Sequence, residues 1–100
     1  MEFLMNDFVK TEQMASILKA LGNVKRLEIM HILCHGEKKV GELEKDVRIS
    51  QSALSQHLAV LRTAGLVSTR RNAQSVYYSI ADIKCRNLLD FLNKNYPQEA

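Results

Sequence analysis

The sequence predicts a mainly α-helical α+β domain with about five helices and one two-stranded β-hairpin. Apolar residues recur at helical spacing along most of the chain, and two runs of β-branched and aromatic residues occur together between residues 66 and 80. No linker, repeat or low-complexity segment divides the chain, and its single proline is Pro97. One hundred residues with 46% hydrophobic content suit a single domain, which we expect to span residues 1–100.

The first part of the chain is predicted to form two helices, preceded by an N-terminal arm at residues 1–8. The first helix covers about residues 11–21, and its apolar face is formed by Met14, Ile17, Leu18 and Leu21. A second helix covers about residues 24–34 and carries apolar residues on more than one face, so we expect it to lie in the centre. Residues 36–39 are predicted to turn the chain.

Residues 40–64 are predicted to form a helix-turn-helix. A short helix is indicated by Val40, Leu43 and Val47. A tight turn follows, and then Ser50 is a suitable N-cap for a longer helix that ends at Gly65. Leucines recur at positions i, i+4 and i+7 of that helix and predict a buried stripe made of Leu54, Leu58 and Leu61.

The other face of this longer helix carries small polar groups and no carboxylate. Its outward residues are predicted to be Gln51, Ser52, Ser55, Gln56, Ala59 and Arg62. Glutamine can pair with the edge of adenine, serine can donate to a base or a phosphate, and arginine can reach phosphate or guanine. This composition favours a helix that reads a groove of double-stranded DNA.

Charge is distributed unevenly along the chain, whose formal net charge is +3. Residues 47–81 contain no aspartate or glutamate, and their cations are Arg48, Arg62, Arg70 and Arg71. Such a concentrated basic surface attracts a polyanion. Residues 66–80 are predicted to form a hairpin with a polar tip at residues 72–74, which would be a wing beside the helix-turn-helix.

The two ends of the chain are predicted to form a homodimer interface. A last helix within residues 82–96 has a surplus of apolar side chains, which are Ile83, Leu88, Leu89, Phe91, Leu92 and Tyr96. The helical region at residues 9–21 is also apolar. Excess apolar surface on terminal elements is typical of helices that pack against a second copy.

The order of these elements and four sequence motifs resemble the ArsR family of winged-helix repressors, and most closely its HlyU/BigR-like branch. The motifs are Lys25-Arg26-Leu27-Glu28-Ile29, Val40-Gly41-Glu42-Leu43, Ser50-Gln51-Ser52-Ala53-Leu54-Ser55-Gln56-His57-Leu58 and Leu61-Arg62-Thr63-Ala64-Gly65-Leu66-Val67. The resemblance covers residues 9–96. It implies a dimeric repressor that binds a pseudo-palindromic operator and leaves it when an inducer reaches the dimer.

A dimer of this kind places two recognition helices in successive major grooves and a wing beside each of them. Lys25 and Arg26 would then bind phosphate at the start of the second helix, and His57 would pack or touch a phosphate. The candidate DNA-binding residues are Lys25, Arg26, Gln51, Ser52, Ser55, Gln56, His57, Arg62, Arg70, Arg71 and Gln74.

The resemblance to the HlyU/BigR-like branch implies a thiol switch, in which two cysteines are joined by oxidation or by sulfur atoms. Cys34 and Cys85 are therefore the candidate sensor residues. Their positions are shifted, because the branch's cysteines fall at His31 and near Pro97. Buried structural cysteines are an equally good interpretation. At the positions that match the metal sites of other family members, this chain lacks the metal-binding side chains, so we expect no metal. An alternative metal site is formed by His31, Cys34 and His35, which share a helix face.

Several classes of function are disfavoured. No catalytic triad, phosphate-binding glycine loop or carboxylate pair is present, so we expect neither an enzyme nor a cofactor. No secretory leader or membrane-spanning run is found, which with two cysteines indicates a cytoplasmic protein with reduced thiols. Two alternatives remain: a winged-helix module that binds protein, and an inducer-independent DNA-binding anti-silencer.

Overall fold

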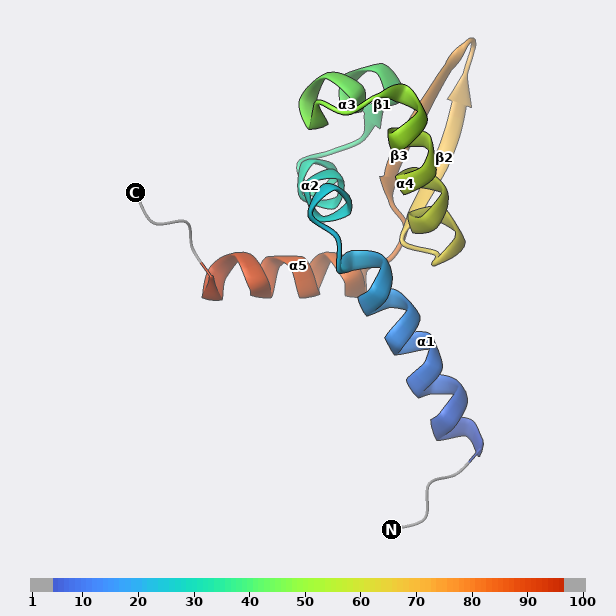
Figure 1. The fold of residues 1–100 in the computed structure, drawn as a ribbon, viewed down its shortest axis with the longest axis vertical. Helices are drawn as coiled ribbons and strands as arrows, with labels where there is room; N and C mark the ends of the chain where they lie inside the picture. Colours follow the sequence, from blue (N-terminus) through green and yellow to red (C-terminus); the bar gives the residue numbers. More distant parts are fainter. Residues whose placement is uncertain (1–4, 97–100) are drawn as a thin grey trace.

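Five helices and a small antiparallel sheet, which lies at one side of the domain, form the computed structural model, which describes residues 5–96 (Figure 1). The helices of this described part are α1 (Met5–Leu21), α2 (Val24–Leu33), α3 (Val40–Val47), α4 (Gln51–Thr63) and α5 (Ile83–Asn95). Its strands are β1 (Lys38–Lys39), β2 (Val67–Asn72) and β3 (Ser75–Ile80). The prediction of a mainly helical domain with five helices and a hairpin is confirmed.

The sheet has one strand more than predicted. Its order is β1-β3-β2, with Tyr77 of β3 opposite Lys39 on one side and Arg70 on the other. The residues 36–39 were expected to form only a turn, but Lys38 and Lys39 form β1. A strand of two residues has no alternating pattern of its own, because it is defined by pairing with a strand distant in the sequence.

The core lies between α2, α4 and the sheet. Ile29, Met30 and Leu33 of α2 are buried, as expected for a central helix. The predicted leucine stripe of α4 is also buried. The complete set of buried apolar residues is Ala20, Leu21, Ile29, Met30, Leu33, Leu43, Val47, Leu54, Leu58, Leu61, Leu66, Val67, Cys85 and Leu89.

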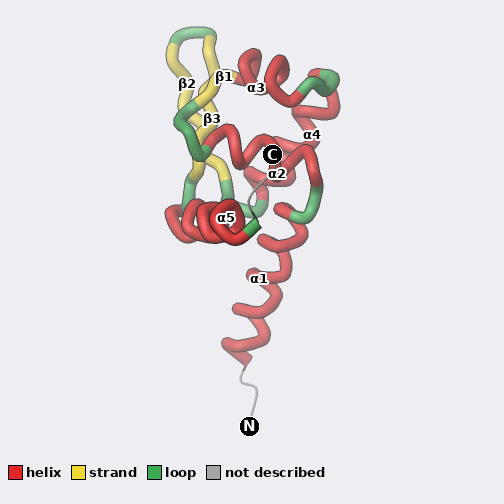
Figure 2. The backbone as a smooth tube through the Cα atoms, turned by 90° about the vertical axis from the view of Figure 1, so that its left-hand side faces the viewer, coloured by secondary structure: helices red, strands yellow, loops and turns green. Residues whose placement is uncertain are grey.

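Helix α1 extends away from this core (Figure 2). It begins at Met5, six residues before the predicted start, so part of the expected arm at residues 1–8 is helical, and residues 1–4 lie outside the described part. Its last residues, Ala20 and Leu21, are buried. Met14 and Leu18 were expected in an apolar face, but they are 48% and 60% exposed in the monomer. That face therefore lacks a covering within the described chain.

Among residues 5–96, no helix combines the length and the hydrophobicity needed to cross a lipid bilayer.

Candidate nucleic-acid interface

Helix α4 presents the polar face that the sequence predicts. The Ser50 hydroxyl accepts a hydrogen bond from the backbone N–H of Ala53 at 3.1 Å, which fixes the start of the helix. At the other end Ala64 is the C-cap, and the next residue, Gly65, adopts a positive φ of 76° that ends the helix. The outward side chains are exposed, and they are Gln51, Ser52, Ser55, Gln56, Ala59 and Arg62. These groups can donate to and accept from base edges and phosphates.

Lys25 fixes the other helix of the helix-turn-helix. Its Nζ donates to the carbonyl of Val47 at 3.1 Å and pairs with the carboxylate of Glu28 at 3.4 Å. Val47 ends α3, and the next residue, Arg48, adopts the left-handed conformation with φ of 58°. The lysine predicted to bind phosphate thus caps the carbonyl end of α3 and holds the turn that leads into α4.

Arg26, the second predicted phosphate ligand, joins three helices. Its Nε and Nη2 donate to the carbonyls of Ala20 and Lys19, which are among the last residues of α1. Its Nη1 lies 3.3 Å from Nδ1 of His57 on α4, and His57 is half-buried. The arginine therefore connects α1, α2 and α4. This arrangement matches the packed role that was one of the two expectations for His57.

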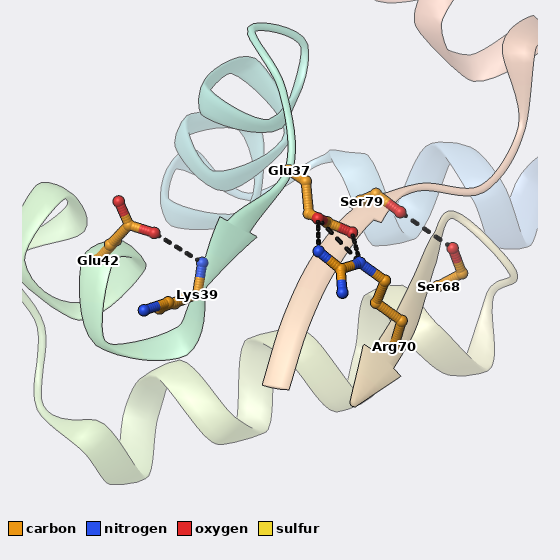
Figure 3. A network of polar contacts seen from close by, with 6 residues as sticks. All are labelled: Glu37, Lys39, Glu42, Ser68, Arg70 and Ser79. Carbon is orange, nitrogen blue, oxygen red and sulfur yellow. Dashed lines mark hydrogen bonds and ion pairs between the residues drawn. The ribbon is translucent and has the colours of Figure 1, made fainter. Parts of the chain in front are cut away.

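Of the two wing arginines predicted to contact DNA, Arg70 has an ion-pair partner and Arg71 has none among residues 5–96. Arg70 forms a bidentate ion pair with Glu37, with Nη2 to Oε1 at 2.7 Å and Nε to Oε2 at 2.8 Å (Figure 3). Arg71 and Gln74 are exposed. Successive residues of a strand point to opposite faces, so Arg70 shares a face with Tyr77 and Arg71 lies on the other face.

Cys34 caps the end of α2 and Cys85 lies in the first turn of α5, where the adjacent Arg86 donates to the carbonyl of Cys34. Both are free, as expected for thiols, with Cys34 half-buried and Cys85 buried. Burial raises the pKa of Cys34, while the charge and hydrogen bond of Arg86 oppose that rise. Burial also raises the pKa of Cys85, and the charges of Asp82 and Cys34 raise it further. Both thiols are thus protonated at neutral pH.

The alternative metal site is not assembled. In the described part of the chain, no group of three His, Cys, Asp or Glu side chains is arranged to hold a metal ion. The rings of His31 and His35 lie 5.6 Å apart, edge to face. Nδ1 of His35 instead contacts the carbonyl of His31 at 3.1 Å, and Nδ1 of His31 contacts the amide of Asn93 at 3.2 Å. Cys34 shares a helix face with His31 and His35, but the three side chains are not arranged as the ligands of one metal ion.

Two residues outside the predicted site emerge from the structure. Glu37 holds Arg70, and Arg86 donates to the backbone carbonyl of Cys34. Glu37 is 33 residues from its partner and Arg86 is 52 residues from Cys34. Contacts between residues so far apart cannot be predicted from the local sequence. The sequence does show that the positive charge of Arg86 lies next to Cys85.

Comparison with known families and curated proteins gives a consistent result. The sequence profile described as "Bacterial regulatory protein, arsR family" matches residues 23–69. The chain is 45% identical over 82 residues to the transcriptional activator HlyU of Vibrio cholerae, covering 82% of this chain and 76% of HlyU. It is 40% identical over 83 residues to the biofilm growth-associated repressor of Xylella fastidiosa, covering 83% of this chain and 73% of that repressor.

Solved structures share the fold over nearly the whole chain. Reduced HlyU from Vibrio cholerae superposes with a TM-score of 0.85 at 40% identity, covering 95% of this chain and all of that one. A homodimeric winged helix-turn-helix DNA-binding domain from Mycobacterium bovis, a possible ArsR-family regulator, also gives 0.85 at 25% identity. That match covers 97% of this chain and 96% of the other.

Proposed function

The chain belongs to the ArsR family of bacterial regulatory proteins and is a DNA-binding transcriptional regulator; we propose that it acts as a cytoplasmic dimeric repressor released by modification of its thiols. One observation carries the DNA-binding part. Helix α4 exposes a continuous polar face with no carboxylate, in a stretch of chain, residues 47–81, that contains four arginines and no acid. A phosphate backbone favours such a surface over any surface with interspersed acids.

The DNA arrangement follows from the position of α4 and the wing. Helix α4 enters the major groove with Gln51, Ser52, Ser55 and Gln56 toward the bases, and Arg62 reaches the backbone. Arg71 and Gln74 of the wing contact the flanking backbone or minor groove. A two-fold dimer places the second α4 about 34 Å away, one helical turn along a pseudo-palindromic operator.

Dimerisation is supported by apolar side chains that the monomer leaves exposed on α1 and α5. On α1 these include Val9 at 51% and Leu18 at 60% exposure, and on α5 they include Ile83 at 65% and Phe91 at 60%. Exposed apolar surface of this kind on two terminal helices favours burial against a second copy. The homodimeric relative from Mycobacterium bovis has the same fold.

Release from DNA is proposed to begin at Cys34, the more exposed thiol. Cys34 first loses its proton to solvent, and the small population of thiolate attacks a sulfane sulfur of a polysulfide. The rest of the polysulfide leaves as an anion one sulfur shorter, and Cys34 becomes a persulfide. The Cys85 thiolate then attacks the inner sulfur and expels hydrosulfide, forming a disulfide between α2 and α5. We propose that forming this bond shifts α2 relative to α5 and thereby alters the spacing of the recognition helices.

The test is an anisotropy titration of the protein onto DNA from upstream of its own coding sequence and onto a scrambled duplex. Binding is measured with reduced thiols, after treatment with a polysulfide, and after later addition of reductant. We expect tight, sequence-specific binding that is lost on treatment and restored by reductant. The matched variants Cys34→Ala and Cys85→Ala should bind in the reduced state and resist treatment.

The remaining alternatives are distinguished by the same titration. Specific binding that polysulfide leaves unchanged would reject the thiol switch and favour an inducer-independent regulator, such as an anti-silencer. Equal affinity for both duplexes would reject sequence-specific reading by α4.

A further inference from the structure

The ion pair between Glu37 and Arg70 crosses the whole sheet. Glu37 immediately precedes β1, while Arg70 lies on β2, and these are the two outer strands of the order β1-β3-β2. Tyr77 of the central strand pairs with Arg70, and its ring centroid is 4.3 Å from the Arg70 guanidinium. Lys39 lies 5.7 Å from the centroid of the same ring. The contact thus connects the chain after α2 to the middle of strand β2 of the wing.

The pair is held by several contacts on one edge of the guanidinium. Three contacts of 2.7 to 3.0 Å join the Arg70 Nε and Nη2 to the two carboxylate oxygens. A bidentate contact of this type fixes the relative orientation of two planar groups, which a single contact between flexible side chains does not. Stacking on Tyr77 fixes the guanidinium from a second direction. Both contacts restrain the angle at which the wing leaves the body of the domain.

The opposite face of the wing is the one that turns toward the recognition helix. Tyr78 is half-buried and packs against the core, and it lines a surface pocket with Ser55 and Arg62 of α4. Arg71 lies on the face of Tyr78, because it is one residue from Arg70 on the same strand. The orientation of the sheet therefore determines where Arg71 meets DNA.

We infer that Glu37 and Arg70 are positioning residues for DNA binding, which orient the wing so that Arg71 and Gln74 reach the duplex. This inference rests on the wing contacts of the proposed function. A carboxylate near a DNA-binding surface repels phosphate, so its charge alone weakens binding. If Arg70 itself contacted phosphate, Glu37 would compete with the DNA for it. The two roles predict opposite signs for the removal of the Glu37 charge.

The experiment measures affinity for the upstream duplex over a range of salt concentrations. The variant Glu37→Gln should bind about threefold to tenfold more weakly than the native protein although it loses a negative charge, with the same salt dependence. Arg70→Lys keeps its positive charge but loses the bidentate geometry, and should weaken binding similarly. The control Glu44→Gln removes a negative charge from α3 and should bind equally or more tightly. The double variant E37R/R70E should recover most of the loss.

Two results would overturn the inference. One is Glu37→Gln binding as tightly as the native protein or more tightly, together with a salt slope reduced by about one in Arg70→Gln, which would make Arg70 a phosphate ligand. The other is unchanged hydrogen exchange at the backbone amides of Ala73 and Gln74 in Glu37→Gln, where faster exchange is expected. If Arg71→Ala leaves affinity unchanged, the wing contact itself is wrong, and this outcome is distinct from a failure of positioning alone.

Discussion

Arg26 and His57 are joined by a hydrogen bond of 3.3 Å between a guanidinium nitrogen and Nδ1 of the imidazole. A guanidinium has only donors, so Nδ1 is the acceptor and His57 carries its proton on Nε2. The same guanidinium donates to two carbonyls at the end of α1. One side chain thus links the helix proposed to form the dimer with the helix proposed to read DNA.

Replacing Arg26 with alanine should destabilise the fold more than it changes DNA contacts. The variant loses three hydrogen bonds from a charged, half-buried group, and we expect the free energy of unfolding to fall by about 1–3 kcal/mol. Urea unfolding followed by circular dichroism measures this loss. Arg26→Lys should recover little of it, because an ammonium group cannot reach all three acceptors at once. Full stability in Arg26→Ala, together with a salt slope lower by about one, would instead identify a phosphate ligand.

Gln56 is expected to read a base. Its side chain is exposed on α4, where a glutamine can make two hydrogen bonds to adenine. Gln56→Ala should weaken binding to the operator by roughly 1–3 kcal/mol and binding to scrambled DNA much less. Anisotropy titrations of both duplexes measure the difference. An equal loss on the two duplexes would contradict base reading.

Arg71 provides the contrast to Gln56, because a phosphate contact carries no sequence information. Arg71→Ala should weaken operator and scrambled DNA about equally, and it should reduce the slope of log affinity against log salt by about one. The slope of Gln56→Ala should remain that of the native protein. A selective loss on the operator in Arg71→Ala would assign the wing a role in base recognition.

The dimer can be tested at Leu18, which is 60% exposed on α1. A glutamate there costs little in the monomer but places a charge in an apolar interface, where it has no partner. Leu18→Glu should therefore be monomeric in sedimentation equilibrium, keep a native thermal midpoint at low concentration, and bind the operator weakly. A dimer that persists with unchanged operator affinity would exclude this face of α1 from the interface.

Local features of the site follow directly from the sequence. The start of α4 at Ser50, its end at Gly65 and its buried leucines depend on residues within one helix, and all are found as predicted. The helix period and the capping preferences act over a few residues, so neighbours in the sequence suffice to identify them. The exposure of Gln56 follows from the same period, because the buried stripe fixes which side turns outward.

The features that could not be predicted all depend on contacts distant in the sequence. The bonds of Arg26 and the pairing of Arg70 with Glu37 are set by tertiary packing, so both arginines resemble free cations in the sequence. Strand β1 exists through pairing with β3. The apolar period of α1 predicts a helix correctly, yet it does not specify whether Leu18 is covered by its own chain or by a second one.

The reactivity of the two thiols should rise with pH well into the alkaline range. The thiolate is the nucleophile, and burial raises the pKa of both Cys34 and Cys85 above the ordinary value of 9.0. Alkylation by iodoacetamide at neutral pH should therefore be slower in the folded protein than in the urea-unfolded chain. Cys34, the more exposed thiol, should react faster than Cys85. The single-cysteine variants Cys34→Ala and Cys85→Ala separate the two rates.

The same shifts determine how stability depends on pH. Well below pH 9.0 both thiols are protonated in the folded and unfolded chains, so the stabilising effect of the raised pKa values is fully present there. Above this pH the unfolded chain releases its protons first, and the free energy of unfolding should decrease as the pH rises toward the pKa values of the folded state.

Arg86→Gln should slow the alkylation of Cys34, because Arg86 lowers the pKa of that thiol. A folded-state alkylation rate that levels off below pH 8 would show a stabilised thiolate and contradict the burial argument.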